Sequence, residues 1–333
     1  MRLIDSHKRV IDYLRLSVTD RCNLQCSYCA PLEGRRHLAR NEILSYEELL
    51  RIARAAACAG IRKIRITGGE PLVRKGIVAF CDKLAAIDGL REVSLTTNGV
   101  RLKEMAAPLF EAGIRRINVS LDTLRPERFH SITGSDRLHD VLAGLEEAER
   151  VGFAPIKLNV VVMRGVNDDE IRRIAELTQD NPLHVRFIEL MPVKHWDPAE
   201  YRKRFMPVDE MMQRIPSIQS ARVGFAMDTA GPAQMCTLPK AKGRVGFIAP
   251  LSWHFCGTCN RLRTTVDGKI RNCLFSEHEL DFKTALRKGA TPLELIRILR
   301  QSVEQKPRRH YLVGGARRRR EADQRRGMYA IGG

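Results

Sequence analysis

The sequence lacks a hydrophobic run long enough to cross a membrane, which takes about 18 to 20 consecutive apolar residues. The first stretch, Met1 to Leu14, alternates charged and apolar side chains and lacks the apolar core of a signal peptide. Acidic residues are also few, with 39 Asp and Glu against 57 Lys and Arg. These absences exclude a membrane-spanning helix and predict a cytoplasmic location. In that compartment disulfides are rare, and clustered cysteines more often bind metal or carry out redox chemistry.

The net charge of +18 over 333 residues bears on partners rather than on fold. It favours phosphorylated ligands, nucleic acid or an anionic surface. Seven of the excess charges lie between Lys306 and Arg326, where nine basic residues stand against two acidic ones. A charge run of this kind is usually a solvated or nucleic-acid-binding tail. The chain then ends in Gly332-Gly333, a pair small enough to enter spaces that side chains cannot.

The first 190 residues alternate two hydrophobic periods. Short β-branched runs alternate with stretches whose apolar residues recur every three or four positions, a pattern typical of strands alternating with helices. The predicted strands are residues 14–18, 63–67, 93–97, 116–121, 156–162 and 185–190. Ser45 with Glu48 predicts a capping box for a helix that ends at Gly60, Gly113 ends another, and Asn167 is predicted to cap a third.

Polar residues cluster where these strands end. Asp20 and Arg21 follow the first strand, and Thr67-Gly68-Gly69-Glu70 follows the second. Because active sites of parallel barrels gather at the carboxyl ends of their strands, the fold class is predicted to be α/β, an incomplete (β/α)6 TIM-type barrel. The barrel is predicted to cover residues 1–192. Residues 193–333 form a smaller C-terminal region with a hairpin turn at Asp267-Gly268, a second cysteine group and the Gly-Gly tail.

The nine cysteines divide into two triads and three isolated residues. The first triad follows the first strand as C-x3-C-x2-C and consists of Cys22, Cys26 and Cys29. The second triad lies across the late hairpin and consists of Cys256, Cys259 and Cys273. The isolated residues are Cys58, Cys81 and Cys236. Cys58 and Cys81 fall on helical patterns, which predicts that they are buried packing residues.

Each triad is one ligand short of the four that a structural zinc ion or an iron–sulfur cubane normally takes. His254 could complete a zinc ribbon at the second triad, and spacing alone leaves that alternative open. At the first triad, neither His7 nor His37 stands at ligand spacing. Three thiolates within eight residues fit a large cubane better than one zinc ion. Such a cubane keeps one iron open to a small molecule, so the first triad predicts a chemical site.

The first triad lies in Cys22-Asn23-Leu24-Gln25-Cys26-Ser27-Tyr28-Cys29, which resembles the cluster motif of radical S-adenosylmethionine enzymes. Thr67-Gly68-Gly69-Glu70-Pro71 resembles their GGEP motif. Five further segments resemble one family in particular, the GTP 3′,8-cyclases, also called molybdenum cofactor biosynthesis protein A. These segments are 13–21, 157–162, 186–192, 259–263 and the terminal Gly332-Gly333. The resemblance runs from about Asp5 to the last residue, nearly the whole chain.

The resemblance implies two [4Fe–4S] clusters, S-adenosyl-L-methionine as cofactor and GTP as substrate. The first triad would hold one cluster, and the cofactor would contact Tyr28, Gly69, Glu70, Ser120 and Met191. The second triad would hold the other cluster, facing the guanine. GTP would contact Arg15, Arg65, Thr96, Lys157, Arg261, Leu262 and Arg263. The residues with implied catalytic roles are Arg261, Arg263, Gly332 and Gly333, since the family's Gly-Gly tail reaches into the active site.

The implied reaction is a radical cyclisation, and the implied enzyme is a lyase. Reductive cleavage of S-adenosylmethionine would give a 5′-deoxyadenosyl radical that takes the 3′ hydrogen of GTP. Formation of a bond between C3′ and C8 would give 3′,8-cyclo-7,8-dihydro-GTP, the first step of molybdenum cofactor (molybdopterin) biosynthesis. The resemblance further implies a reductant protein such as flavodoxin or ferredoxin, cyclic pyranopterin monophosphate synthase as functional partner, and a homodimer. Neither a membrane nor nucleic acid is expected as a partner.

Two alternatives stay open from the residues. One is a radical S-adenosylmethionine enzyme with an auxiliary cluster that modifies RNA or a peptide; it explains the basic tail but not Arg261-Leu262-Arg263 beside Cys259. The other is a zinc-stabilised nucleic-acid-binding module, whose affinity would fall steeply with salt. The cyclase interpretation predicts a brown protein with about eight irons per chain if both clusters are cubanes. Finding only stoichiometric zinc would exclude it.

Overall fold

The computed structural model describes residues 2–29, 37–192, 196–220, 231–276, 278–310, 312 and 327–332. The six predicted strands are present, each within one residue of its predicted bounds, and they pair in chain order and in parallel. They are β3 (Tyr13–Ser17), β4 (Lys63–Thr67), β5 (Glu92–Thr97), β6 (Arg116–Ser120), β7 (Lys157–Val162) and β8 (His184–Glu189). The alternation of hydrophobic periods therefore predicted these elements correctly.

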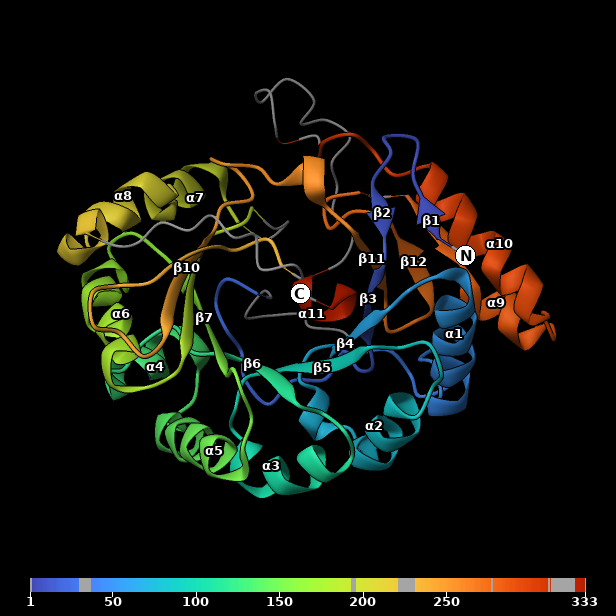
Figure 1. The fold of residues 1–333 in the computed structure, drawn as a ribbon, viewed down its shortest axis with the longest axis horizontal. Helices are drawn as coiled ribbons and strands as arrows, with labels where there is room; N and C mark the ends of the chain where they lie inside the picture. Colours follow the sequence, from blue (N-terminus) through green and yellow to red (C-terminus); the bar gives the residue numbers. More distant parts are fainter. Residues whose placement is uncertain are drawn as a thin grey trace.

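The sheet curves, and helices that follow the parallel strands cover its outer side (Figure 1). These helices are α1 (Tyr46–Ala59), α2 (Ile77–Ala85), α3 (Leu102–Glu111), α4 (Pro126–Thr133), α5 (Leu138–Val151) and α6 (Ile171–Asp180). Apolar side chains on the outer face of the strands, such as Leu14, Ile64 and Leu95, are fully buried. The sheet thus has an apolar outer layer against the helices, which leaves its inner face for polar residues. The prediction of an incomplete α/β barrel is confirmed.

The C-terminal region adds strands to both edges of this sheet, which has 11 strands in all among the described residues. At one edge, β11 (Arg261–Thr264) pairs in parallel with β3 and continues through β12 (Lys269–Arg271) to β13 (Glu279–Asp281). At the other edge, β10 (Arg244–Ile248) pairs in parallel with β8, and β9 (Gln234–Cys236) follows it. The C-terminal region therefore shares hydrogen bonds with both ends of the barrel. The boundary at residue 192 stays a prediction.

Helix α1 begins and ends as the sequence indicated. The Ser45 hydroxyl accepts from the Glu48 backbone N–H at 3.2 Å, and the Glu48 carboxylate accepts from the Ser45 N–H at 2.7 Å. Gly60 ends the helix with a φ of 113°, a left-handed conformation that glycine adopts without a steric penalty. Because this helix connects the loop after β3 to β4, its capping box fixes where the chain turns back toward β4.

One local prediction holds in part and one is wrong. Asn167 stands at the N-cap position of η2 (Asp168–Glu170), as predicted, but its side chain does not cap that helix: its amide oxygen accepts from Met163 N–H at 2.8 Å, and its amide nitrogen donates to the Asp122 and Val161 carbonyls. Tertiary contacts across two loops therefore outweigh the local capping preference. Cys58 is exposed rather than buried, because it shares the solvent-facing side of α1 with Arg54, one turn before it. Cys81 and Cys236 are buried, as expected of packing residues.

The remaining elements surround this sheet. The helices are α7 (Pro198–Arg204), α8 (Val208–Gln213), α9 (Phe282–Arg287), α10 (Pro292–Glu304) and α11 (Met328–Ile331). A separate hairpin consists of β1 (Leu3–Ile4) and β2 (Val10–Ile11). The short 3-10 helices are η1 (Pro71–Val73), η2 (Asp168–Glu170), η3 (Pro216–Ser220) and η4 (Cys256–Thr258). Hydrogen bonds from Arg51 and ion pairing of Arg287 with Glu48 attach α9 and the loop after it to α1. Figure 1 shows α11, near the C-terminus, inside the curve of the sheet.

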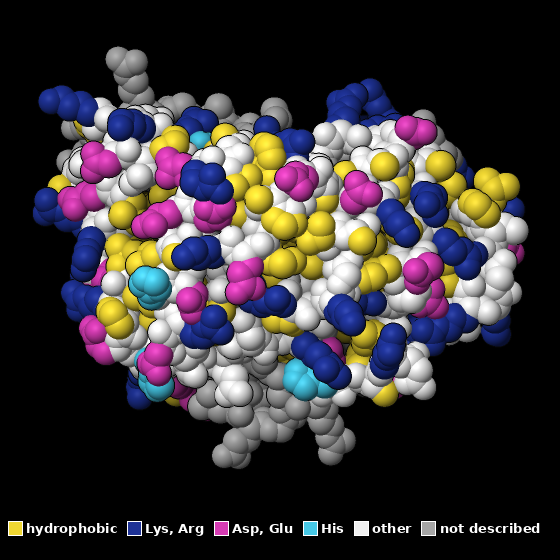
Figure 2. All heavy atoms as spheres, turned by 90° about the horizontal axis from the view of Figure 1, so that it is seen from below, with side chains coloured by type: hydrophobic (Ala, Val, Ile, Leu, Met, Phe, Trp, Pro, Cys, Tyr) yellow, Lys and Arg dark blue, Asp and Glu magenta, His cyan; other side chains and the backbone are white. Residues whose placement is uncertain are grey.

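The outer surface shows no segregation of charge on the face drawn in Figure 2, where Lys and Arg are interspersed with Asp, Glu and hydrophobic side chains. Within the described ranges, none of the helices has the length and apolar character needed to span a bilayer.

Candidate functional site

One cavity of about 320 Å³ lies on the inner face of the curved sheet. Residues from all six barrel strands or the loops after them line it, together with residues of the C-terminal region. All six cysteines of the two triads line this cavity. The sequence predicted each triad but not that they share one cavity. The parallel pairing of β11 with β3 produces this arrangement, because it places the second triad near the amino end of β3 while the first triad follows the carboxyl end of the same strand.

The first triad occupies the loop that follows β3. Its three thiols are partly exposed to the cavity. They lie close enough to interact: burial raises the pKa of Cys26 well above its usual value, and Cys29, Asp122 and Cys22 raise it further. The amide nitrogen of Asn98 lies 3.7 Å from the Cys22 sulfur. The three thiols therefore lie close together, as joint ligands of one metal cluster must, and a bound metal would displace their protons.

The loop after β4 lies directly against the first triad. The Glu70 carboxylate is buried and accepts from the Leu72 N–H at 2.9 Å, the Asn98 N–H at 2.6 Å and the Thr97 hydroxyl at 2.8 Å. Burial nevertheless raises its pKa to about 7. At Gly69 a Cβ atom would come within 2.4 Å of the Arg21 carbonyl oxygen. Glycine is therefore required here, because it lets this loop approach the loop that carries the first triad.

The second triad spans η4 and the loop after β12. Burial raises the pKa of Cys256, and Cys273 and Cys259 raise it further, which shows the three thiols to be neighbours. Burial acts in the same direction on Cys259, but Arg261 and Lys306 outweigh it and lower that pKa to about 6. His254, the fourth ligand in the zinc-ribbon alternative, does not line the cavity that these three cysteines face.

Basic side chains converge on the cavity between the two triads. In the sheet register, Arg263 of β11 faces Arg15 of β3, which faces Arg65 of β4. Residues of neighbouring strands at one register point to the same face, so these three guanidiniums share the inner face. Burial, then repulsion by Arg261, lowers the pKa of Arg263 to about 10. Burial and Arg263 lower the pKa of Arg15 too. Crowded, buried cations of this kind favour binding of a polyanion.

Arg186 is a cavity residue to which the sequence assigned no role. It lies on β8, is 4% exposed and lines the cavity. In the amide orientation that satisfies its neighbours, Asn118 Oδ1 accepts from Arg65 Nη1 at 2.5 Å and Arg186 Nη2 at 2.7 Å. Asn118 thus joins two cations from strands that are far apart in sequence. The sequence did contain a signal for a role of Arg186, because burying a cation within an otherwise apolar strand costs free energy unless the cation has a partner.

The C-terminal tail reaches the basic cluster. The Gly332 carbonyl accepts from Arg15 Nε and from Arg263 Nη1, both at 3.0 Å. Gly332 has a φ of 70°, and a Cβ atom there would lie 2.3 Å from the Thr67 hydroxyl. No other residue fits this position without displacing the chain. Gly333 lies outside the described residues, so its predicted role is not tested.

The other predicted contacts mostly line the same cavity. These are Tyr28, Gly69, Glu70, Ser120 and Met191 from the cofactor set, and Arg15, Arg65, Thr96, Lys157, Arg261 and Arg263 from the substrate set. Thr96 Oγ1 is buried without a hydrogen-bond partner in the described structure, as is Asn159 Oδ1. Leu262 differs, because its side chain is fully buried and does not line the cavity. Side chains alternate along β11, so Arg261 and Arg263 face the cavity and Leu262 faces the core.

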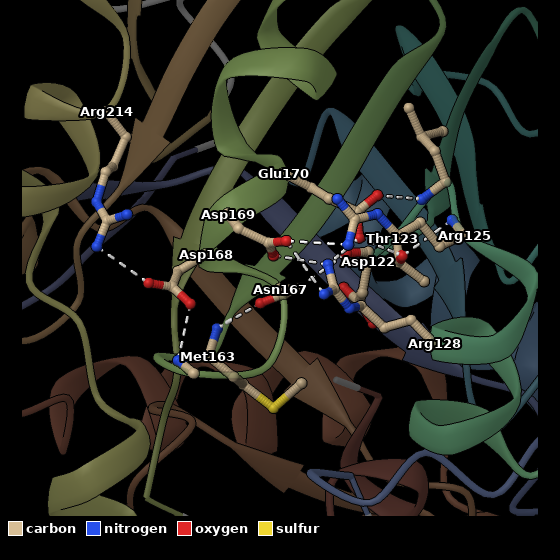
Figure 3. A network of polar contacts seen from close by, with 12 residues as sticks. Asp122, Thr123, Arg125, Arg128, Met163, Asn167, Asp168, Asp169, Glu170 and Arg214 are labelled. Carbon is tan, nitrogen blue, oxygen red and sulfur yellow. Dashed lines mark hydrogen bonds and ion pairs between the residues drawn. The ribbon is translucent and has the colours of Figure 1, made fainter.

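A polar network joins the loops after β6 and β7, and Figure 3 shows Asp122, Thr123, Arg128 and Glu170 within it. The Tyr28 hydroxyl donates to Asp122 Oδ2 at 2.7 Å, and Val161 N–H donates to Asp122 Oδ1 at 2.8 Å. Burial raises the pKa of Asp122 to about 6. The neighbouring loops are joined by Thr123, which donates to Glu170 at 2.5 Å, and by Arg128, which pairs with Glu170. The loops after β6 and β7 therefore hold Asp122, and through it Tyr28, in one place.

Comparison with known proteins adds the family context. Residues 16–178 match the family model described as Radical SAM superfamily, and residues 183–312 match Molybdenum Cofactor Synthesis C. The GTP 3′,8-cyclase of Heliobacterium modesticaldum is 49% identical over 93% of this chain and 95% of its own length. The GTP 3′,8-cyclase of Geobacter sulfurreducens is 50% identical over 93% of this chain and 94% of its own length. That of Moorella thermoacetica is 46% identical over 99% of this chain and 99% of its own length.

Among solved structures, Streptococcus suis SuiB bound to S-adenosylmethionine is similar with a TM-score of 0.57 and 14% identity. The match covers 93% of this chain and 79% of that one. At this identity, the likeness shows a shared fold only.

Proposed function

The chain belongs to the GTP 3′,8-cyclase family of the radical SAM superfamily, and on that premise we propose that this cavity holds S-adenosylmethionine and GTP between two [4Fe–4S] clusters. The family makes it an enzyme of molybdenum cofactor biosynthesis. The observation that carries the proposal is the position of the two cysteine triads, which face one cavity across a cluster of buried arginines.

The donor sets fit the proposed groups. Each triad offers three thiols that interact electrostatically and face the cavity, as three-cysteine ligation of a cubane requires. At the first triad, the buried carboxylate of Glu70 would accept from the amino group of S-adenosylmethionine. Tyr28, Ser120 and Met191 line the adjoining wall, where an adenosine would be held. When bound, the first cluster and S-adenosylmethionine would supply the one-electron chemistry that starts the radical cyclisation of GTP.

The protein's own residues would then bind and orient the substrate. The guanidiniums of Arg15, Arg65 and Arg263 would hold the triphosphate, whose charge relieves their mutual repulsion. Thr96 Oγ1 and Asn159 Oδ1, which are buried without a hydrogen-bond partner in the described structure, would form hydrogen bonds with the nucleoside. The second triad, next to Arg261, would lie against the base. The tail glycine would fix the orientation of Arg15 and Arg263 and narrow the cavity, excluding water from the reacting centre.

Three further expectations follow from the resemblance and stay predictions. They are a flavodoxin or ferredoxin as reductant, cyclic pyranopterin monophosphate synthase as functional partner, and a homodimer.

An anaerobic assay tests the proposed function. We expect the iron-reconstituted protein, given GTP, S-adenosylmethionine and a chemical reductant, to consume GTP and to form 5′-deoxyadenosine in equal amounts, as measured by mass spectrometry. Reconstituted protein is expected to hold about eight irons per chain. Cofactor cleavage with intact GTP would refute the substrate, and an iron content of about four would refute the second cluster.

Arg186→Gln is expected to weaken GTP binding without loss of either cluster. A hydrogen bond to a charged group contributes about 1.5–3 kcal/mol, so we expect KM for GTP to rise roughly 10- to 100-fold. Steady-state kinetics at varied GTP check this, and the affinity for S-adenosylmethionine should not change. Arg172→Gln is the matched control, because Arg172 forms an exposed ion pair with Glu176 on α6. An unchanged KM in Arg186→Gln would place this residue outside the GTP site.

A further inference from the structure

Lys306 is a buried lysine that joins the two segments of the second triad. It follows α10 by two residues and is 4% exposed. Its ammonium donates to the Arg261 carbonyl at 2.9 Å and to the Asn272 carbonyl. Arg261 lies two residues after Cys259, and Asn272 directly precedes Cys273. A single side chain from outside the sheet therefore holds together the strand and the loop that carry two of the three thiols.

Among the described residues, no carboxylate lies within 4.0 Å of the Lys306 nitrogen, although a buried ammonium needs a counter-charge. Its electrostatic neighbours include Cys259 and Cys273: burial lowers the pKa of Lys306, and these two cysteines oppose that shift. The two carbonyls satisfy the hydrogen bonds of the ammonium. The cysteines, as ligands of a bound cluster, would supply the negative charge beside it.

The other cations near this triad differ from Lys306 in their surroundings. Arg9 donates to the Cys256 carbonyl at 2.6 Å, but its charge is paired with the buried Asp5 carboxylate at 2.6 Å. Arg261 Nη2 donates to the Cys259 sulfur at 3.7 Å, but its side chain also lines the cavity, where it would meet the bound substrate. Lys306 does not line the cavity. Its charge would therefore continue to act on the second triad when substrate is bound.

The first triad has the opposite electrostatic surroundings. Among the described residues, buried carboxylates lie beside it, since Asp122 raises the pKa of Cys26 and the Glu70 loop packs against the same segment. A nearby positive charge stabilises an electron added to an iron–sulfur cluster, and a nearby negative charge destabilises it. The two cluster sites of this chain thus differ in the sign of the charge buried beside them.

We propose that Lys306 is the counter-charge of the second cluster, which holds its two cysteine segments in register and raises its reduction potential relative to the first cluster. The inference rests on the proposed second cluster. It makes Lys306 a positioning residue, because it acts through the cluster ligands and does not reach the substrate.

The test is a redox titration of the reconstituted full chain, followed by electron paramagnetic resonance of both clusters. Lys306→Gln keeps a hydrogen-bond donor and removes the charge, Lys306→Met removes both, and Lys306→Arg keeps the charge. We expect the second cluster to shift to lower potential in the Gln and Met variants and to stay near its original potential in the Arg variant. The first cluster serves as an internal reference and should not shift. Lys269→Met is the control, since that lysine has its own carboxylate in Asp281.

Equal potentials of the second cluster in all three Lys306 variants, or an equal fall at both clusters, would overturn the proposal. If both neutral variants lose the second cluster while Lys306→Arg retains it, the proposal is supported, because the charge is then what the cluster requires. Failure of the proposed function is seen separately, as wild-type protein that binds only about four irons.

Discussion

Gly332→Ala is expected to reduce turnover of GTP by roughly 100-fold or more while both clusters and the fold persist. A Cβ atom would lie 2.3 Å from the Thr67 hydroxyl, and the φ of 70° is unfavourable for alanine. The tail would have to leave its position and give up the hydrogen bonds from Arg15 and Arg263. Each hydrogen bond from a charged donor contributes about 1.5–3 kcal/mol. If the geometry of the reacting groups depends on both bonds, their loss should lower the rate about 100-fold or more.

Gly289→Ala is the matched control for this prediction. Gly289 has a similar φ of 84°, but a Cβ atom there would meet nothing within 4 Å. It therefore reproduces the backbone strain without the collision. Anaerobic turnover, iron content and thermal unfolding should be measured for both variants. Full activity in Gly332→Ala would show that the tail position has no part in catalysis, whereas equal losses in both variants would trace the effect to strain alone.

Cys256→Ala is expected to abolish cyclisation of GTP and to halve the iron content, from about eight to about four per chain. A cubane with two thiolates in place of three would lose one of its protein ligands. Turnover should fall by more than about 1,000-fold, because binding of the substrate base and its conversion both require the second site.

The control for the cysteine substitution is Cys236→Ala. Cys236 is buried in β9 and does not line the cavity, so its removal should leave iron content and turnover near those of the original chain. In Cys256→Ala the first cluster should still bind S-adenosylmethionine, which its electron paramagnetic resonance spectrum in the presence of the cofactor would show. Retention of about eight irons in Cys256→Ala would remove this cysteine from the ligand set.

The elements of the fold could be read from local patterns, because hydrophobic periodicity and caps report local structure. All six barrel strands and the capping box at Ser45 were predicted correctly. Local rules failed where a distant contact decided the outcome. Asn167 bonds across two loops instead of capping, and Cys58 lies on the one side of α1 that faces solvent. Leu262 stands within a basic motif, yet strand alternation turns its side chain into the core.

The sequence by itself determined the chemistry: two cysteine triads, a Gly-Gly-Glu loop and cations within apolar strands. Residue type and short spacing carry this information, and neither depends on the path of the chain. Only the tertiary structure decided that strands of the C-terminal region close both edges of the sheet, since pairing partners are chosen by packing over long separations. That pairing brings both triads, Arg186 and Gly332 to one cavity. The tertiary structure also places Lys306, the first residue of the basic run at 306–326, next to the second triad and not at the surface.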